Sequence, residues 1–221
     1  MMKKMVVGLL VLCMSFGLSG IVNAAYGAKE RLMPPETMIT VSKAELDLRD
    51  NMRKLWSNHV FWTRLYVVSS VANQSDSGLN KERLLKNPEY IGNALKPYYG
   101  NDAGERLTLL LKDHILISAD IIALSKKGEM TAVTERENKW MANADAIAMF
   151  LNEINPHWEV NEMKNLLLEH LALSKGELTA RLNDSQLSDI LTFDKIYTQA
   201  LVVADAMTDG IVKQYPTMFG Q

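Results

Sequence analysis

The chain has 221 residues, of which 48% are hydrophobic and 23% are charged, a composition that suits one globular domain with an ordinary core. Its 24 basic and 26 acidic residues give a formal net charge of −2 at pH 7 and form no basic block, so nucleic acid is not expected as a partner. A single cysteine, Cys13, excludes an intramolecular disulfide.

The N-terminus has the pattern of a secretory signal peptide. A short basic head at 1–4 precedes an uncharged, mostly apolar run at 5–22, and the tripeptide VNA at 22–24 fits the small-x-small cleavage rule. We therefore expect a signal peptide over 1–24 and an exported protein, either periplasmic or extracellular. The apolar run is about the minimum length for a membrane span, so an uncleaved N-terminal anchor is the alternative and the only membrane contact expected.

The rest of the chain divides into a linker, one domain and a tail. Residues 25–41 contain two adjacent prolines and no clear periodicity, which is typical of a loosely ordered linker. A single helical domain is expected over 42–216, followed by a tail at 217–221.

The first predicted helix begins at a capping box, in which Ser42 is followed three residues later by Glu45. Apolar residues then recur at spacings of three and four to about Ala72, which predicts one long amphipathic helix. Residues 73–80 are polar and are expected to be a loop.

The remaining predicted helices are bounded by prolines, glycines and capping residues. They comprise a short helix over 87–100 and long helices over 102–127, 131–153, 159–182 and 186–214. No segment alternates with a period of two. The predicted fold class is therefore all-α: an antiparallel helix bundle of five long helices and one short helix.

Two segments suggest an internal two-fold repeat. "LLLKDHIL" at 109–116 resembles "LLLEHLAL" at 166–173, and the alignment of 107–118 with 163–174 pairs His114 with His170. Leucines align easily between any two amphipathic helices, so repeat and coincidence both stay open.

Three of the four histidines are predicted to point inward. His59, His114 and His170 each share a helical face with apolar residues three, four and seven positions away, whereas His157 lies in a turn. A buried imidazole needs partners for its nitrogens. Hydrogen bonds to protein groups would meet this need and hold the helices in register. A transition metal is the other partner that imidazoles converging inside a bundle can share.

Inward carboxylates are candidates to complete such a metal site. Glu177 lies on the face of His170, and Asp145 lies among Met141, Ala148 and Met149. Arg64 and Asp205 are further polar residues expected to point inward. Arg64 is expected to be the ion-pair partner of an inward acid, with anion binding as the less favoured alternative. Neither Glu-x-x-His nor His-Glu-x-x-His occurs, so the ferritin-like di-iron site and the common zinc-protease site are not expected.

Six segments resemble, in order and spacing, a family of uncharacterised bacterial all-helical proteins, some of which carry transferase or kinase names without an established active site. The segments are 55–64, 87–100, 107–116, 140–158, 166–182 and 207–216. Most members of that family lack an export signal, so the leader is a departure from it. The resemblance implies a helical fold but no function, and it implies matching residue types at ten positions: His59, Trp62, Arg64, Asn93, His114, Asn143, Asp145, His170, Glu177 and Asp205.

Two functions are compatible with these observations. The sequence has no G-x-S-x-G elbow, phosphate-binding glycine loop or cysteine nucleophile outside the leader, so a non-enzymatic binding or interaction protein of the cell envelope is expected first. Its partner would be a small ligand or another envelope protein. The alternative is a metal-binding bundle, in which His59, His114 and His170 hold a divalent transition metal for storage, sensing or hydrolysis.

Overall fold

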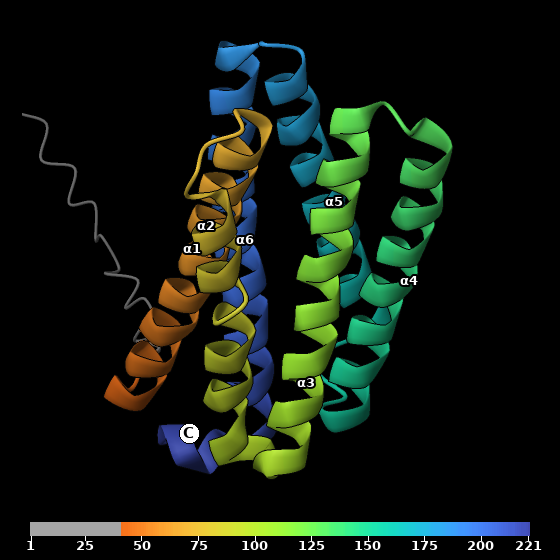
Figure 1. Cartoon of the computed structure of the whole chain (residues 1–221). Coiled ribbons are helices and arrows are strands. Elements are labelled where there is room, and N and C mark those ends of the chain that lie inside the picture. Colours follow the sequence, from red (N-terminus) through yellow and green to blue (C-terminus); the bar gives the residue numbers. More distant parts are fainter. Residues whose placement is uncertain (1–40) are drawn as a thin grey trace, which may run out of the picture. The chain divides into compact units, whose positions relative to one another are not determined.

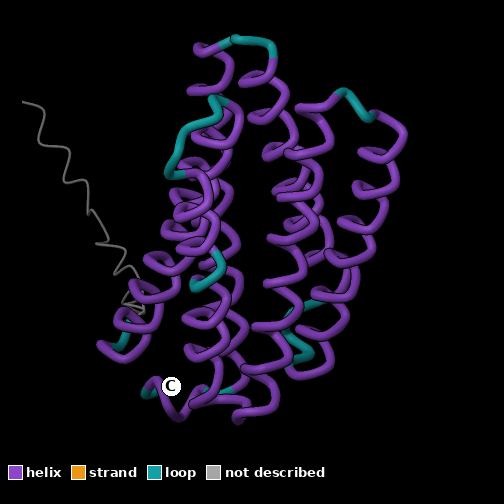
Figure 2. The backbone as a smooth tube through the Cα atoms, viewed as in Figure 1, coloured by secondary structure: helices purple, strands orange, loops and turns teal. Residues whose placement is uncertain are grey.

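The computed structural model describes residues 41–221 (Figure 1). The predicted signal peptide, and all of the predicted linker except Val41, lie outside the described residues. Within 41–221 all regular structure is helical, which confirms the all-α fold class (Figure 2). Among these helices none combines the length and the apolar character that a membrane crossing requires.

Five long helices close into a ring, because each packs against two neighbours. In chain order the elements are α1 (Lys43–Val71), α2 (Ser77–Leu84), α3 (Asn87–Lys127), α4 (Met130–Ile154), α5 (Val160–Leu182), α6 (Gln186–Gln214) and the 3-10 turn η1 (Pro216–Phe219). α1 packs against both α3 and α6, while α4 lies between α3 and α5, and α5 in turn contacts α6 (Figure 1). The short helix α2 packs on α1 and touches α3.

α1 begins where the capping box predicts, although only half of the box forms. The Ser42 hydroxyl accepts a hydrogen bond from the backbone N–H of Glu45 at 3.2 Å. The Glu45 carboxylate does not bind the backbone N–H of Ser42. It accepts hydrogen bonds from Arg49 at 3.0 Å and from Gln221 at 3.3 Å instead. The helix start is therefore tied to the C-terminal end of the chain.

The predicted loop over 73–80 is too long, because it is confirmed over 73–76 but α2 begins inside it at Ser77. The residues at the end of the predicted loop form the solvent-facing start of this helix. Its apolar anchor, Leu84, lies just beyond the polar stretch and is buried in the core. Asn80 also ties the helix to α1 by donating to the Ser69 hydroxyl at 3.1 Å.

α3 is a hairpin of two helical arms, which matches the predicted short helix over 87–100 and long helix over 102–127. The backbone reverses at Gly100, whose φ of 83° is a conformation that favours glycine. The arms approach so closely that a Cβ on Gly92 would run into the carbonyl oxygen of Gly104. This hairpin lays the N-terminal residue Asn87 against α1, where its amide donates to the Leu55 carbonyl at 2.9 Å.

The bounds of α4, α5 and α6 lie within one residue of those predicted. The predicted tail at 217–221 is wrong, because η1 carries Phe219 back into the core, where it is 3% exposed. The Phe219 ring stacks on Tyr98 at a centroid distance of 6.2 Å. The domain therefore extends almost to the C-terminus.

Candidate metal centre

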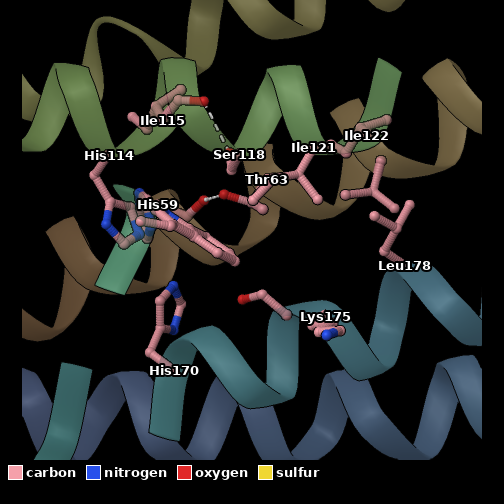
Figure 3. A pocket seen from close by; sticks show the side chains of 13 residues that line it. His59, Thr63, His114, Ile115, Ser118, Ile121, Ile122, His170, Lys175 and Leu178 are labelled. Atoms are coloured by element: carbon pink, nitrogen blue, oxygen red, sulfur yellow. Dashed lines mark hydrogen bonds between the residues drawn. The ribbon is translucent and has the colours of Figure 1, made fainter. Parts of the chain in front are cut away.

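Three histidines converge at the centre of the ring of helices. His59 on α1, His114 on α3 and His170 on α5 are 5%, 4% and 4% exposed. One ring nitrogen from each lies within 4.8 Å of the other two, and the ring centroids are 5.5 to 6.4 Å apart. Figure 3 shows the three imidazoles facing one another from three separate helices. The inward orientation expected from their helical faces is the one observed.

An amide side chain from another helix lies beside each imidazole. At His114 the amide is Asn143 on α4, whose oxygen is 3.1 Å from His114 Nδ1 and whose NH₂ group donates to the Leu110 carbonyl at 3.0 Å. Because an amide oxygen can only accept, the shared proton must be on His114 Nδ1, and this leaves a free lone pair on Nε2.

The same anchoring recurs at the other two histidines. Asn87 donates to the Leu55 carbonyl at 2.9 Å, and Gln199 on α6 donates to the Leu166 carbonyl at 2.7 Å. In all three cases the carbonyl belongs to the residue one helical turn before the histidine. The amide follows that residue by 32, 33 and 33 positions. The two-fold repeat suggested by His114 and His170 is thus one part of a three-fold pattern that includes His59.

The three amide oxygens make fewer hydrogen bonds than the three NH₂ groups. Asn143 accepts from the ring of His114, and Asn87 and Gln199 lie beside the rings of His59 and His170. Among the described residues, however, the Asn87 and Gln199 oxygens and His170 Nδ1 have no hydrogen-bond partner within bonding geometry. A small shift of each amide toward its ring would complete the arrangement that His114 already has.

Burial controls the charge of the three rings. It lowers the pKa of His114 to about 3 and that of His170 to about 4, and it holds the pKa of His59 well below its usual value. The neighbouring imidazoles lower the pKa of His59 and His114 further. All three rings are therefore neutral at pH 7, which is the form that binds a metal.

The metal-free protein is expected to lose stability between pH 7 and pH 5. The three folded-state pKa values lie below the unfolded value of about 6.5, so the unfolded chain takes up protons first as the pH falls. At pH 5 this costs about 2 kcal/mol per imidazole. Glu177 offsets part of this loss of stability, by about the amount that one imidazole costs, because burial raises its pKa to about 7. Urea melts of chelator-treated protein should show a net loss of about 4 kcal/mol; equal stability at both pH values would contradict the buried, neutral state of the rings.

The carboxylates expected to complete the site lie elsewhere. Glu177 binds Arg64 at 2.6 Å, and Asp145 pairs with Lys164 at 2.9 Å with a side chain that is 43% exposed. Neither joins the group of nitrogen atoms formed by the histidines. The expectation that these two acids are ligands is therefore wrong, because Asp145 reaches a lysine at the surface and Glu177 lies two turns beyond His170.

The two other polar residues expected to point inward differ from each other. Arg64 pairs with an inward acid as expected, since it binds both Glu177 and the fully buried Asp189. Asp205 is instead half-buried near the surface, where it binds Arg49 at 3.3 Å and Arg53 at 2.7 Å. These two arginines of α1 draw the carboxylate out of the core.

The three histidines could hold a metal ion and would leave one of its coordination positions open. Zinc bonds to imidazole nitrogen are about 2.0–2.1 Å long, so a tetrahedral ion would draw the three nitrogens to about 3.3 Å from one another. Three protein ligands plus one open position are typical of catalytic zinc sites, whereas structural sites have four protein ligands. A partner that accepts the other ring N–H, as Asn143 does from His114, orients a metal-binding histidine.

Replacing Asn143 with leucine is expected to weaken metal binding about 10- to 100-fold. The variant removes the acceptor that keeps the proton on His114 Nδ1, so the ring is free to present the wrong nitrogen. Competition with a chromogenic chelator measures the affinity. Asn152→Leu on the same helix is the matched control, because Asn152 donates to the Trp158 carbonyl at 3.0 Å, away from the histidines. Equal affinities of the two variants would show that Asn143 does not orient the ligand.

Asn87 and Gln199 are site residues that the sequence did not single out. By its neighbours in the chain Asn87 reads only as a helix cap beside a proline, and nothing local distinguishes Gln199. Each of these amides follows, at a nearly constant distance along the chain, the leucine that lies one turn before its histidine. This spacing is visible in the sequence and is the signal that could have identified both residues.

Comparison with known proteins adds no further constraint on this centre. No protein-family model matches the chain, and no match was found among curated proteins or solved structures. The resemblance to an uncharacterised helical family therefore stays a prediction.

Proposed function

We propose that this protein binds one divalent transition-metal ion of the zinc class through His59, His114 and His170. The observation that carries the proposal is the convergence of three buried imidazoles from three helices, each with an anchored amide beside it. Imidazole nitrogen is a favoured ligand of zinc, copper, iron and nickel.

A purely structural role accounts less well for the three rings. In that role each ring would hold helix register by hydrogen bonds to protein groups. Among the described residues the ring nitrogens make one hydrogen bond within bonding geometry, from His114 Nδ1 to Asn143, and this leaves His114 Nε2 without a protein partner. Burying polar groups without partners is costly. A shared metal ion supplies three nitrogens with a partner at once.

The site favours a single, tightly held ion over storage of many ions. It is buried, it offers only nitrogen ligands, and it leaves a coordination position that water can fill. A metal-bound water or a bound small molecule at that position is the simplest basis for a hydrolytic or sensing activity. Following the predicted export signal, we place this activity in the cell envelope as part of the proposal.

Elemental analysis of protein purified without a histidine tag tests the proposal. The protein is stripped with chelator, reconstituted with zinc or cobalt(II), and desalted. One ion per chain is expected, with the intense visible absorption of four-coordinate cobalt(II). Protein that retains no metal after reconstitution would overturn the proposal and return the histidines to a structural role in a binding or interaction protein.

A further inference from the structure

A small cavity adjoins the three imidazoles and extends along the bundle axis. Its volume is about 30 Å³, which is room for about two water molecules. Figure 3 shows the histidines at one end and Ile121, Ile122 and Leu178 at the other. The cavity therefore offers a metal ion at the histidines a small compartment with an apolar far end.

A hydroxyl group lies between these two ends on each of the three helices. Thr63, Ser118 and Ser174 follow His59, His114 and His170 by one helical turn each, and all three line the cavity. Residues one turn apart share a helical face, so each helix presents its histidine and its hydroxyl to the same space. The three-fold pattern that supplies the amides supplies these hydroxyls as well.

Two of these hydroxyls donate their only proton to a backbone carbonyl of their own helix. Thr63 Oγ1 donates to the His59 carbonyl at 2.8 Å, and Ser118 Oγ donates to the Ile115 carbonyl at 2.8 Å; both bonds are drawn in Figure 3. A hydroxyl has one proton and two lone pairs. Toward anything in the cavity these two oxygens can therefore only accept hydrogen bonds.

We propose that Thr63 and Ser118 select and position a protic ligand, water in the resting protein, at the open coordination position of the metal. The proposal rests on the proposed metal site. A water bound to the ion through its oxygen has two protons to donate, and two acceptor oxygens lie on the same side of the imidazoles. The substrate class that fits is a small neutral molecule with an O–H or N–H group at the metal and at most a few non-hydrogen atoms.

Thr63 and Ser118 disfavour aprotic anions for the same reason. Azide and thiocyanate carry no proton, so at this position they would meet the lone pairs of Thr63 and Ser118 with nothing to donate. Thr63 and Ser118 are therefore positioning residues, since they act on the ligand and not on the metal.

Azide titration of the cobalt(II)-loaded protein, followed by visible absorption, tests this inference. The double variant Thr63→Val/Ser118→Ala is expected to bind azide at least about tenfold more tightly than the unaltered protein. A tenfold change in affinity is about the net contribution of one hydrogen bond. Thr63→Ser keeps the acceptor and should behave as the unaltered protein. Thr179→Val is the matched control, because Thr179 makes the same kind of bond, to the Lys175 carbonyl at 2.8 Å, on an exposed face.

The outcomes separate the two proposals. If the unaltered protein binds no cobalt(II), the metal site fails and this inference fails with it. If cobalt(II) binds but azide affinity is the same in the unaltered protein and the double variant, the inference is overturned and the metal site stands. Should the double variant not fold, Ser118→Ala alone is expected to raise azide affinity as well. An azide affinity of Ser118→Ala equal to that of the unaltered protein would also overturn the inference.

Discussion

Zinc at a thousandfold excess over its Kd is expected to raise the free energy of unfolding by about 4 kcal/mol, and His114→Ala is expected to abolish that gain. An ion that binds the folded chain and not the unfolded chain stabilises by mass action, whatever its role in the cell. For a domain of this size the gain corresponds to a rise in Tm of about 8–16 °C. Thermal melts with zinc and with chelator measure it directly.

The metal-free variant separates loss of the ligand from loss of the fold. Without metal, His114→Ala removes a ring that packs on Trp140 at a centroid distance of 5.1 Å and leaves the Asn143 oxygen without its partner. A cost of about 1–3 kcal/mol is expected from the unpaired amide, which is seen with chelator as well as with zinc. The zinc-dependent part of the stability is what His114→Ala should remove in full.

His157→Ala is the matched control for metal binding. His157 is the remaining histidine and lies exposed in the turn before α5. This variant should keep the whole zinc-dependent rise in Tm. If His114→Ala also keeps it, the ion binds somewhere other than the three converging histidines, and the proposed site is wrong.

The fold was predictable because its boundaries are local signals. Ser42, the prolines after residues 87 and 155, and Gly128 mark helix ends by capping chemistry or backbone conformation, which needs no knowledge of tertiary contacts. The two errors, α2 and the C-terminal tail, have one cause. In each, a short segment is anchored by a buried side chain, Leu84 or Phe219, whose burial depends on packing against other helices.

The candidate site was predictable only in part. Periodicity assigns a histidine to the inner face of its own helix, so the inward direction of His59, His114 and His170 could be inferred one helix at a time. Their convergence could not, because it depends on how α1, α3 and α5 are placed around the ring. The same limit explains Glu177, whose inward face was correctly inferred but whose partner, Arg64, comes from another helix.

Arg64→Met is expected to cost about 3–5 kcal/mol of stability, because it breaks a buried ion-pair network. Arg64 joins three helices: it binds Glu177 on α5 at 2.6 Å and Asp189 on α6 at 2.9 Å. The side chains of these acids are 2% and 0% exposed, and within residues 41–221 their only other cation is Arg181, at 3.1 Å from Asp189. Methionine fills similar space without charge, so two buried carboxylates would share one arginine. Urea melts at pH 7 measure the loss.

Arg53→Met is the matched control, because Arg53 pairs with Asp205 at 2.7 Å but its side chain is 44% exposed. Water screens that pair, and a cost of at most about 1 kcal/mol is expected. A loss of similar size in both variants would show that burial is not what makes the Arg64 network important.

The pH dependence of Arg64→Met identifies the group that carries the cost. Burial already raises the pKa of Glu177 to about 7 in spite of Arg64, and removal of the arginine raises it further. A carboxyl whose folded-state pKa is above its unfolded value binds its proton more tightly when folded, so stability falls as the pH rises through that window. The deficit of Arg64→Met should therefore be smaller at pH 5 than at pH 8, and adding Glu177→Gln should remove most of its pH dependence. A deficit that stays constant across this range would assign the loss to packing against Phe193, over whose ring the guanidinium lies at 4.6 Å, and not to the unpaired carboxylate.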